Sequence, residues 1–165
     1  MMVPSASPRI YLLRHARSAW AQPGERDFGR PLDAEGFMEA DAVARRAAGR
    51  GYRPERMISS TALRCRQTAE IVQRAFDEAL PLMFVDELYN APVETYLDIV
   101  AENSGLASLM LVGHNPSIEE VLEKLIGADE SASTIPTGYP TAGLAILDRP
   151  DDDSPFWYLA DFLTG

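Results

Sequence analysis

The sequence predicts an α/β fold: a three-layer sandwich with a mostly parallel central sheet and an antiparallel edge hairpin. Short apolar runs alternate with helical periodicities along the chain, which is typical of a parallel sheet with crossover helices. Two further apolar runs, 143–147 and 156–162, flank a polar segment and predict the hairpin. The 165 residues are 46% hydrophobic and 24% charged, so we expect one domain spanning residues 1–165.

Four short apolar runs are expected to form the parallel part of the sheet. They are residues 9–13, 56–59, 81–85 and 108–112. The last of these, SLMLV, is apolar at four consecutive positions. A strand covered on both faces needs such a run. Residues 108–112 are therefore the clearest candidate for a strand buried on both faces.

Helical patterns separate these runs. Asp33 is expected to cap a first helix, in which apolar residues recur at helical spacing until Gly49. The other expected helices are 60–76 with Ser60 as cap, 92–103 with Pro92 in the first helical position, and 115–127 with Asn115 as cap and Pro116 as first residue. The Ser-, Thr- and Pro-rich residues up to Thr141 are expected to form a loop.

Composition excludes several classes of protein. The chain has 25 acidic and 15 basic residues, a formal charge of −10, which argues against a nucleic-acid-binding face. The single Cys65 excludes an intrachain disulfide and a cysteine metal cluster. No apolar run approaches the roughly 18 residues of a membrane helix. Because residues 1–8 carry no charge and the apolar run after them is short, we expect no secretory signal and a cytoplasmic protein. The acidic run 151–153 is interpreted as a solvated turn.

The only two histidines occupy equivalent places in the predicted fold. His15 and His114 each follow an expected strand after one intervening residue, Arg14 or Gly113. In open α/β sheets, ligands bind beyond the carboxyl ends of the strands. A helix is expected to start just after His114, and a helix N-terminus offers unpaired N–H groups and partial positive charge. The two histidines are therefore candidates for one anion-binding site.

Arginines flank the first histidine, and another stands near an expected helix start. Arg14 precedes His15, Arg17 follows it, and Arg64 lies near the start of an expected helix. The planar guanidinium group matches the paired oxygens of a phosphoryl group. A neutral histidine beside such a group is a competent nucleophile toward phosphorus. Arg66 and Arg74 are expected to lie on a solvated helix face.

Other phosphate chemistries fit the sequence less well. It contains no G-x-x-x-x-G-K-[ST] phosphate-binding loop. A cysteine phosphatase would need an arginine six residues after its cysteine, and Ile71 stands there. A metal site using both histidines and carboxylates is an alternative, but the adjacent arginines would repel a cation.

Four motifs stand in order along the chain: Leu13-Arg14-His15-Ala16, Pro31-Leu32-Asp33-x-x-Gly36, Ser60-Thr61-Ala62-Leu63-Arg64-Cys65-Arg66-Gln67-Thr68 and Val112-Gly113-His114-Asn115-Pro116. Together they resemble the histidine phosphatase superfamily, also called phosphoglycerate mutase-like. Alanine after the Arg-His pair is similar to the short bacterial phosphohistidine phosphatases, whereas most of the family has glycine. The resemblance extends from Tyr11 to about Asp148.

This resemblance implies roles for the candidate residues. His15 would be the nucleophile that is transiently phosphorylated, and Arg14 and Arg64 would hold the phosphoryl oxygens. His114 would donate a hydrogen bond to the phosphoryl group. Substrate-binding positions would be Arg14, Arg64, Ser18 and Asn90. The resemblance implies no metal and no organic cofactor.

One position departs from the family pattern. Many members carry a glutamate in a Leu-x-Glu motif as general acid, and this chain has Asn90 there. Glu87 or Asp86 could supply the proton instead; Glu87 is our candidate acid. An alkoxide leaves poorly without a proton donor. The nitrogen of a phosphoramidate can be protonated beforehand, so Asn90 favours a phosphohistidine substrate.

The spacing between motifs bears on the substrate. Arg64 and His114 are 50 positions apart, which leaves little chain for a lid. An open site suits a phosphorylated residue on a protein surface. We therefore expect a metal-independent phosphatase acting on protein phosphohistidine, with no nucleic-acid or membrane partner. The alternatives are a small-molecule phosphomonoesterase of the same mechanism and a non-catalytic phosphate-binding module. The sequence predicts no oligomeric state.

Overall fold

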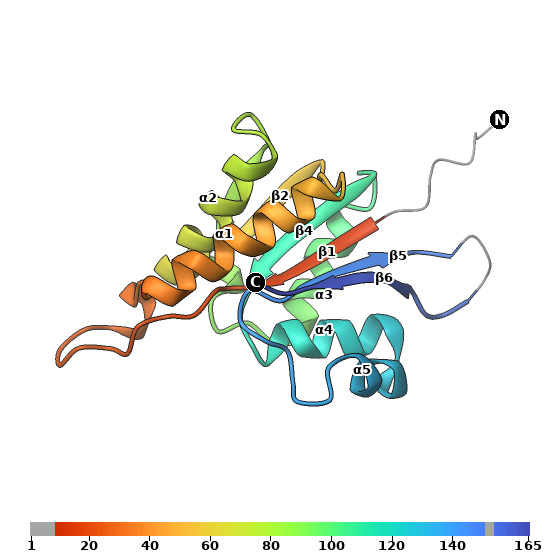
Figure 1. The fold of residues 1–165 in the computed structure, drawn as a ribbon. Coiled ribbons are helices and arrows are strands. Elements are labelled where there is room, and N and C mark those ends of the chain that lie inside the picture. The colour runs from red at the N-terminus through yellow and green to blue at the C-terminus, as the bar shows by residue number, and fades with distance from the viewer. Residues whose placement is uncertain (1–8, 151–153) are drawn as a thin grey trace.

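The computed structural model describes residues 9–150 and 154–165, which contain a six-stranded sheet (Figure 1). The sheet has the order β3-β2-β4-β1-β5-β6. Neighbours among β1 to β4 pair in parallel, whereas β5 pairs antiparallel with both β1 and β6. The strands are β1 (Arg9–Arg14), β2 (Arg56–Ser60), β3 (Leu82–Val85), β4 (Ser108–Gly113), β5 (Leu144–Asp148) and β6 (Tyr158–Leu163). The predicted fold class and edge hairpin are confirmed.

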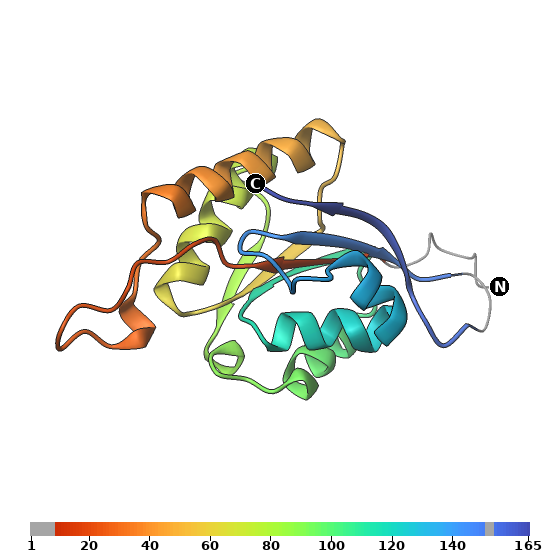
Figure 2. The same ribbon diagram turned by 60° about the horizontal axis from the view of Figure 1, so that its bottom comes forward.

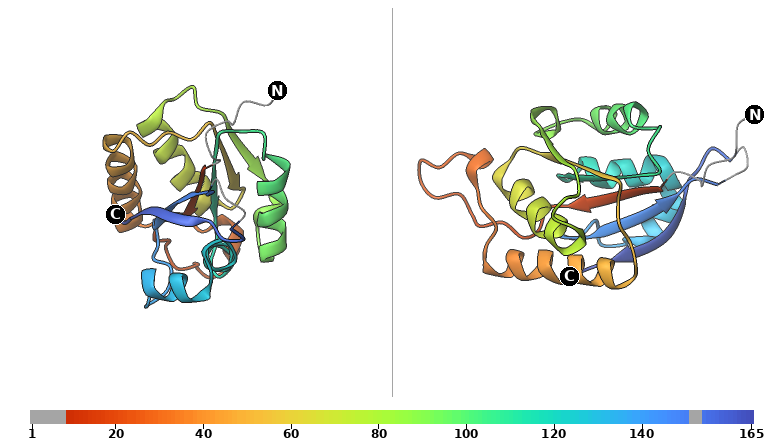
Figure 3. Two further views of the ribbon diagram at one scale, coloured as in Figure 1. Left: turned by 90° about the vertical axis from the view of Figure 1, so that its right-hand side faces the viewer. Right: turned by 90° about the horizontal axis from the view of Figure 1, so that it is seen from above.

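Helices cover both faces of the sheet. The end-on view in Figure 3 shows α1 and α2 on one side and α3 and α4 on the other, and Figure 2 shows the same layers obliquely. The helices are α1 (Ala34–Gly49), α2 (Leu63–Phe76), α3 (Val93–Glu102), α4 (Ser117–Ile126) and α5 (Ala128–Thr134), with 3₁₀ turns η1 (Asp27–Gly29) and η2 (Asp86–Leu88). None of the helices in the described residues is long and apolar enough to span a membrane.

The strands bury side chains on both faces. In β4, Met110 and Val112 join the core beneath α1 and α2, whereas Leu109 and Leu111 join the core beneath α3 and α4. This alternation follows from the two-residue repeat of a strand. Since β4 pairs with β2 and β1, the run predicted to be buried on both faces lies inside the sheet.

The helix starts differ in part from the prediction. Asp33 caps α1 as expected, because its Oδ1 accepts a hydrogen bond from the backbone N–H of Gly36 at 2.7 Å. Ser60 does not cap a helix: it is the last residue of β2, and α2 begins at Leu63 without a side-chain cap. Pro92 and Pro116 stand one residue before their helices rather than inside them.

One segment differs from the prediction, and two others lie outside the described residues. Residues 128–134 form α5, where a loop was expected. This seven-residue helix shows no apolar stripe, because Ser131 is its only buried residue, and it packs on α4. Residues 1–8 and the acidic run 151–153 lie outside the described residues.

Candidate active site

A cavity of about 680 Å³ lies at the carboxyl ends of β1 and β4. Beside it, the chain between β1 and α1 projects from the sandwich (Figure 1). Most of the predicted site residues line this cavity, whereas Arg17 and Glu87 do not. The lining residues are Arg14, His15, Ser18, Arg30, Arg64, Asn90, Ala91, Pro92, His114, Asn115, Pro116, Ser117 and Glu120. The parallel strands thus bring together motifs that are far apart in the sequence.

The hydrogen bonds of His15 define which ring nitrogen is free. Its backbone N–H donates to the carbonyl of Gly113 at 3.0 Å, and its own carbonyl accepts from Ala142 at 3.1 Å. The ring Nδ1 lies 2.7 Å from the carbonyl oxygen of Ala16. Because a carbonyl only accepts, Nδ1 carries the hydrogen and Nε2 keeps its lone pair.

Burial keeps this imidazole neutral. Desolvation lowers the pKa of His15 to about 3, against the hydrogen bond to the Ala16 carbonyl, which raises it; the neighbouring His114, Arg64 and Arg14 lower it further. The side chain is therefore uncharged at neutral pH, and the lone pair on Nε2 is available. The sequence had predicted the residue, and the fold supplies its protonation state.

Arg14 keeps donors for a ligand. It is the last residue of β1, and its Nη1 donates to the carbonyl of Tyr139 at 2.7 Å. Its Nε is buried and has no hydrogen-bond partner within residues 9–150 and 154–165. A buried guanidinium with an unmatched donor is stabilised by an anion.

Arg64 is anchored by Asp27, a residue that the sequence did not single out. Its Nη1 donates to the backbone carbonyl of Asp27 at 2.8 Å, and its Nη2 donates to the carboxylate at 3.0 Å. The same carboxylate accepts from the hydroxyl of Tyr89 at 2.7 Å and from Arg30 at 2.9 Å. These hydrogen bonds, that of Tyr89 foremost, hold the pKa of Asp27 below its usual range. Asp27 therefore stays ionised and orients Arg64.

His114 is placed by contacts with Tyr96 and Ser60. A Cβ on Gly113 would lie 2.3 Å from the Tyr96 hydroxyl, so only glycine fits before His114. That hydroxyl accepts a hydrogen bond from the backbone N–H of His114 at 3.0 Å. The ring Nε2 of His114 lies 2.8 Å from the Ser60 hydroxyl, and its Nδ1 lies 3.4 Å from Nη2 of Arg64.

The two imidazoles face each other edge to face, with their centroids 5.5 Å apart. Burial, and then the charge of Arg64, lowers the pKa of His114 to about 4. Both rings are therefore neutral near pH 7, and the positive charge at the cavity comes from arginines.

Thr68 joins two of the motifs. Its hydroxyl accepts from the backbone N–H of Ala16 at 3.0 Å and donates to the carbonyl of Arg64 at 2.8 Å. The threonine is fully buried. It therefore fixes the chain after His15 against the first turn of α2.

One predicted cation lies elsewhere, and another takes its place. Arg17 pairs with Asp33 at 2.9 Å and with Glu35, and it does not line the cavity. Arg30 lines it instead, and its Nη2 donates to the hydroxyl of Ser18 at 2.9 Å. Arg30 lies in a polar loop without a periodic pattern, so no sequence signal pointed to it.

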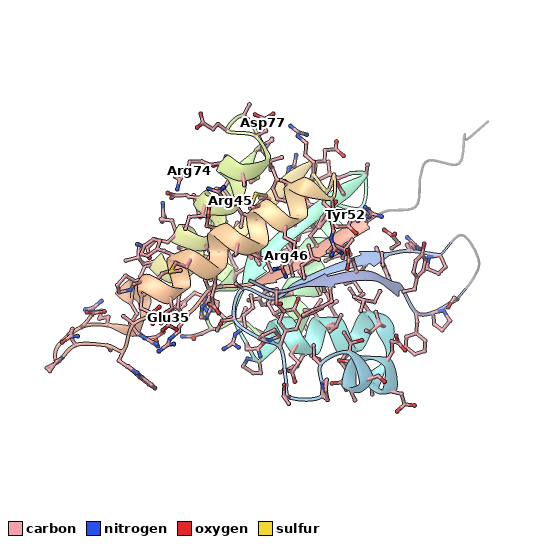
Figure 4. The ribbon with its side chains drawn as sticks, in the orientation of Figure 1. Glu35, Arg45, Arg46, Tyr52, Arg74 and Asp77 are labelled. Carbon is pink, nitrogen blue, oxygen red and sulfur yellow. The ribbon has the colours of Figure 1, made fainter. Side chains whose placement is uncertain are left out.

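The helical arginines lie outside the site, but only Arg74 is exposed as predicted, since Arg66 is half-buried. Arg74 is exposed, and Figure 4 shows it on the outer side of α2. The guanidinium of Arg66 packs over the ring of Phe84, 4.2 Å from its centroid. Neither residue lines the cavity.

The carboxylates are arranged differently from the expectation. Glu87 is exposed in η2 and does not line the cavity, and Asp86 accepts a hydrogen bond from Thr61 at 2.7 Å. Asn90 does line it, and the lining carboxylate is Glu120, in the first turn of α4. The described residues contain no group of three or more His, Cys, Asp or Glu side chains that could hold a metal ion.

Comparison with known proteins identifies the family. The family model described as "Histidine phosphatase superfamily (branch 1)" matches residues 10–92, a range that contains His15 and Arg64. The chain belongs to the histidine phosphatase superfamily. The chain is 31% identical over 140 residues to the uncharacterized chloroplastic protein At3g52155 of Arabidopsis thaliana. That alignment covers 79% of this chain but only 64% of the relative.

Solved structures place this histidine phosphatase near the SixA proteins. A candidate phosphohistidine phosphatase SixA from Agrobacterium tumefaciens is 51% identical with a TM-score of 0.89, and the match covers 96% of this chain and 99% of that one. A protein histidine phosphatase SixA complexed with tungstate has a TM-score of 0.75 at 23% identity, covering 94% and 96% of the two chains, and shares the fold. The similarity supports phosphatase activity.

Proposed function

We propose that this protein is a metal-independent phosphatase in which His15 is transiently phosphorylated. The observation that carries the proposal is the state of its ring. Nδ1–H is held by the carbonyl of Ala16, so a neutral Nε2 is free in a cavity that Arg14 and Arg64 also line. A neutral nucleophile between two guanidinium groups suits attack on a phosphoryl dianion.

In the first step, Nε2 of His15 attacks phosphorus while the bond from phosphorus to the leaving nitrogen breaks. Arg14 and Arg64 stabilise the negative charge on the phosphoryl oxygens. Because Asp27 anchors Arg64, that guanidinium need not reorganise during the reaction. The leaving imidazole departs with the proton that it already carries, and phospho-His15 remains.

In the second step, water attacks phosphorus and the bond to Nε2 breaks. The electron pair of that bond returns to Nε2, so His15 is again neutral with its hydrogen on Nδ1, and inorganic phosphate leaves with the oxygen and the protons of the water. The same arginines stabilise both transition states. Splitting the transfer into two displacements lets one set of positive groups serve twice.

Protein phosphohistidine is the proposed substrate. Asn90 lines the cavity at the position where many superfamily members have an acid. The nitrogen of a phosphoramidate can leave without a general acid, because it can be protonated beforehand. The chain between Arg64 and His114 is largely taken up by α2, β3, η2, α3 and β4, so little of it is left to cover the site. The similarity to a candidate phosphohistidine phosphatase supports the same substrate class. We propose a cytoplasmic phosphoprotein as partner.

The mechanism is tested by replacing His15 with alanine. We expect loss of turnover. We also expect loss of the phosphorus label that wild type retains when the reaction is quenched in alkali, which preserves phosphohistidine. The exposed Arg74→Ala variant, outside the cavity, should keep both. Tungstate should inhibit wild type and a chelator should not. Full activity of the His15 variant, or inactivation by the chelator, would contradict the mechanism.

The substrate class is tested with a panel of phosphohistidine peptides, p-nitrophenyl phosphate and alkyl phosphates. We expect kcat/KM to be highest for phosphohistidine. Glu87→Gln and Glu120→Gln form a matched pair, because both are exposed and only Glu120 lines the cavity. Neither should slow phosphohistidine hydrolysis. A preference for alkyl phosphates that Glu120→Gln abolishes would instead indicate a small-molecule phosphomonoesterase.

A further inference from the structure

Ser60 lies behind His114, outside the cavity lining. It is fully buried at the end of β2, and its hydroxyl oxygen lies 2.8 Å from Nε2 of His114. The same oxygen accepts a hydrogen bond from the backbone N–H of Ala62 at 3.2 Å. The turn into α2 therefore fixes the hydroxyl oxygen, while its hydrogen can still rotate.

The opposite ring nitrogen of His114 faces an obligate donor. Nδ1 lies 3.4 Å from Nη2 of Arg64, and a guanidinium group cannot accept a hydrogen bond. In this arrangement Nδ1 is the acceptor. The single hydrogen of the neutral ring is then on Nε2 and points to the oxygen of Ser60.

A bound phosphoryl group reverses the demand on Nδ1. Its oxygens are negative and accept hydrogen bonds, so a lone pair on Nδ1 would repel them. A neutral imidazole that donates from Nδ1 must accept at Nε2. The group behind the ring must therefore be able to accept in one state and donate in the other, and a hydroxyl can do both.

We propose that Ser60 is a positioning residue that sets the tautomer of His114 and lets Nδ1 change from acceptor to donor when a phosphoryl group binds. The inference rests on the proposed function. One proton leaves Nε2 for water and one arrives at Nδ1 from water, so the net charge is unchanged. The sulfur of Cys65, 3.4 Å from Nε2, is only a weak donor. Burial, which lowers the pKa of His114, opposes the alternative of a charged ring.

The tautomer can be read directly by ¹⁵N NMR of the His114 side chain. In wild type we expect the hydrogen on Nε2 in the free protein and on Nδ1 after tungstate is added. In Ser60→Ala, tungstate should leave Nε2 protonated. The variant's kcat should fall by about 10- to 100-fold, as for other partners that orient a functional histidine. Ser60→Thr, which restores a hydroxyl, should recover the tautomer change.

Ser59→Ala is the matched control. Ser59 is also fully buried in β2, and its hydroxyl donates to the backbone carbonyl of Ser60 rather than to His114. It should behave as wild type. The proposal is overturned if Ser60→Ala still moves the hydrogen to Nδ1 with tungstate, or if both serine variants lose kcat equally. Since the NMR experiment needs only tungstate binding, its result stands apart from whether phosphohistidine is the substrate.

Discussion

At the scale of single residues, one carbonyl group selects the reactive nitrogen. The oxygen of Ala16 fixes the hydrogen of His15 on Nδ1 and leaves the lone pair of Nε2 free for the proposed attack. The identity of His15 could be predicted from the sequence, because a histidine at a strand end beside arginine is an uncommon pattern. Its tautomer and lowered pKa could not, since both depend on burial and on Arg64 and His114, far away in the sequence.

The buried histidines predict how stability depends on pH. Their folded-state pKa values, about 3 for His15 and about 4 for His114, lie below the unfolded value of 6.5. Between pH 6.5 and 4 the unfolded chain binds more protons, so stability falls as the pH is lowered. Near pH 5 the slope should reach about 1.4 kcal/mol per pH unit for each histidine.

Urea unfolding at pH 7, 6 and 5 checks this slope, and His114→Gln should halve it. Asp27 contributes little to the slope between pH 7 and 5, because its ordinary pKa of 3.8 lies below that range and its folded-state pKa is lower still. Its contribution is lost only at lower pH. A free energy of unfolding that stays level from pH 7 to 5 would show that the two rings are not kept neutral.

Gly113 predicts a second residue-scale effect. Its Cα faces the Tyr96 ring, and an added Cβ would lie 2.3 Å from the hydroxyl and 2.6 Å from a ring carbon. Gly113→Ala must push aside a buried tyrosine, which costs about 1–3 kcal/mol as overpacking. It should also disturb the His114 backbone. Gly105→Ala is the control, because its added Cβ would have no neighbouring atom within 4 Å. Thermal unfolding and kcat measure both, and equal effects of the two changes would contradict the steric reason.

At the scale of elements, local sequence marked a helix start only where a side chain caps it. Asp33 caps α1 as predicted, because its Oδ1 accepts from Gly36 while its ion pair with Arg17 uses Oδ2. Ser60 was also predicted as a cap. Instead it is the last residue of β2, and its hydroxyl lies within hydrogen-bond distance of His114. The helix α5 gave no signal, since a short polar helix has no apolar periodicity and is held by packing on α4.

The cap of α1 gives an element-scale prediction. Asp33→Ala should lower the free energy of unfolding by about 1 kcal/mol, because the N–H of Gly36 loses its acceptor. Asp33→Asn should recover most of this loss, since asparagine also caps. Asp41→Ala, on the same helix and paired only with Arg45 on the surface, should cost about 0.3–0.5 kcal/mol. Urea unfolding measures all three, and an equal loss for Asp33→Asn would point to its ion pair with Arg17.

At the scale of the whole molecule, the sheet order determines where the chemistry lies. Because β4 pairs in parallel with both β1 and β2, Arg14 and Gly113 end at the same level and their following residues meet. The net charge of −10 does not govern the site, because Arg14, Arg30 and Arg64 supply its local charge. Long-range charge affects the approach of a ligand, whereas we expect the arginines at the cavity to select what binds.

Two strand methionines test the predicted burial of the sheet centre. Met110 in β4 is fully buried, whereas Met83 in the edge strand β3 is 48% exposed. Met110→Ala should lower the free energy of unfolding by about 2–5 kcal/mol through the cavity that it leaves. Met83→Ala should change it by no more than about 0.5 kcal/mol. Urea unfolding compares them, and similar losses would contradict the placement of β4 inside the sheet.

The sequence by itself determined the fold class, the buried central strand and the residues Arg14, His15, Arg64 and His114. Each has a local signature, either a periodicity or a motif at a strand end. Only the tertiary structure decided that Asp27 anchors Arg64, that Arg30 rather than Arg17 borders the cavity, and that Ser60 backs His114. These roles depend on pairings between segments that are distant in the chain, and such pairings leave no periodic trace in the sequence.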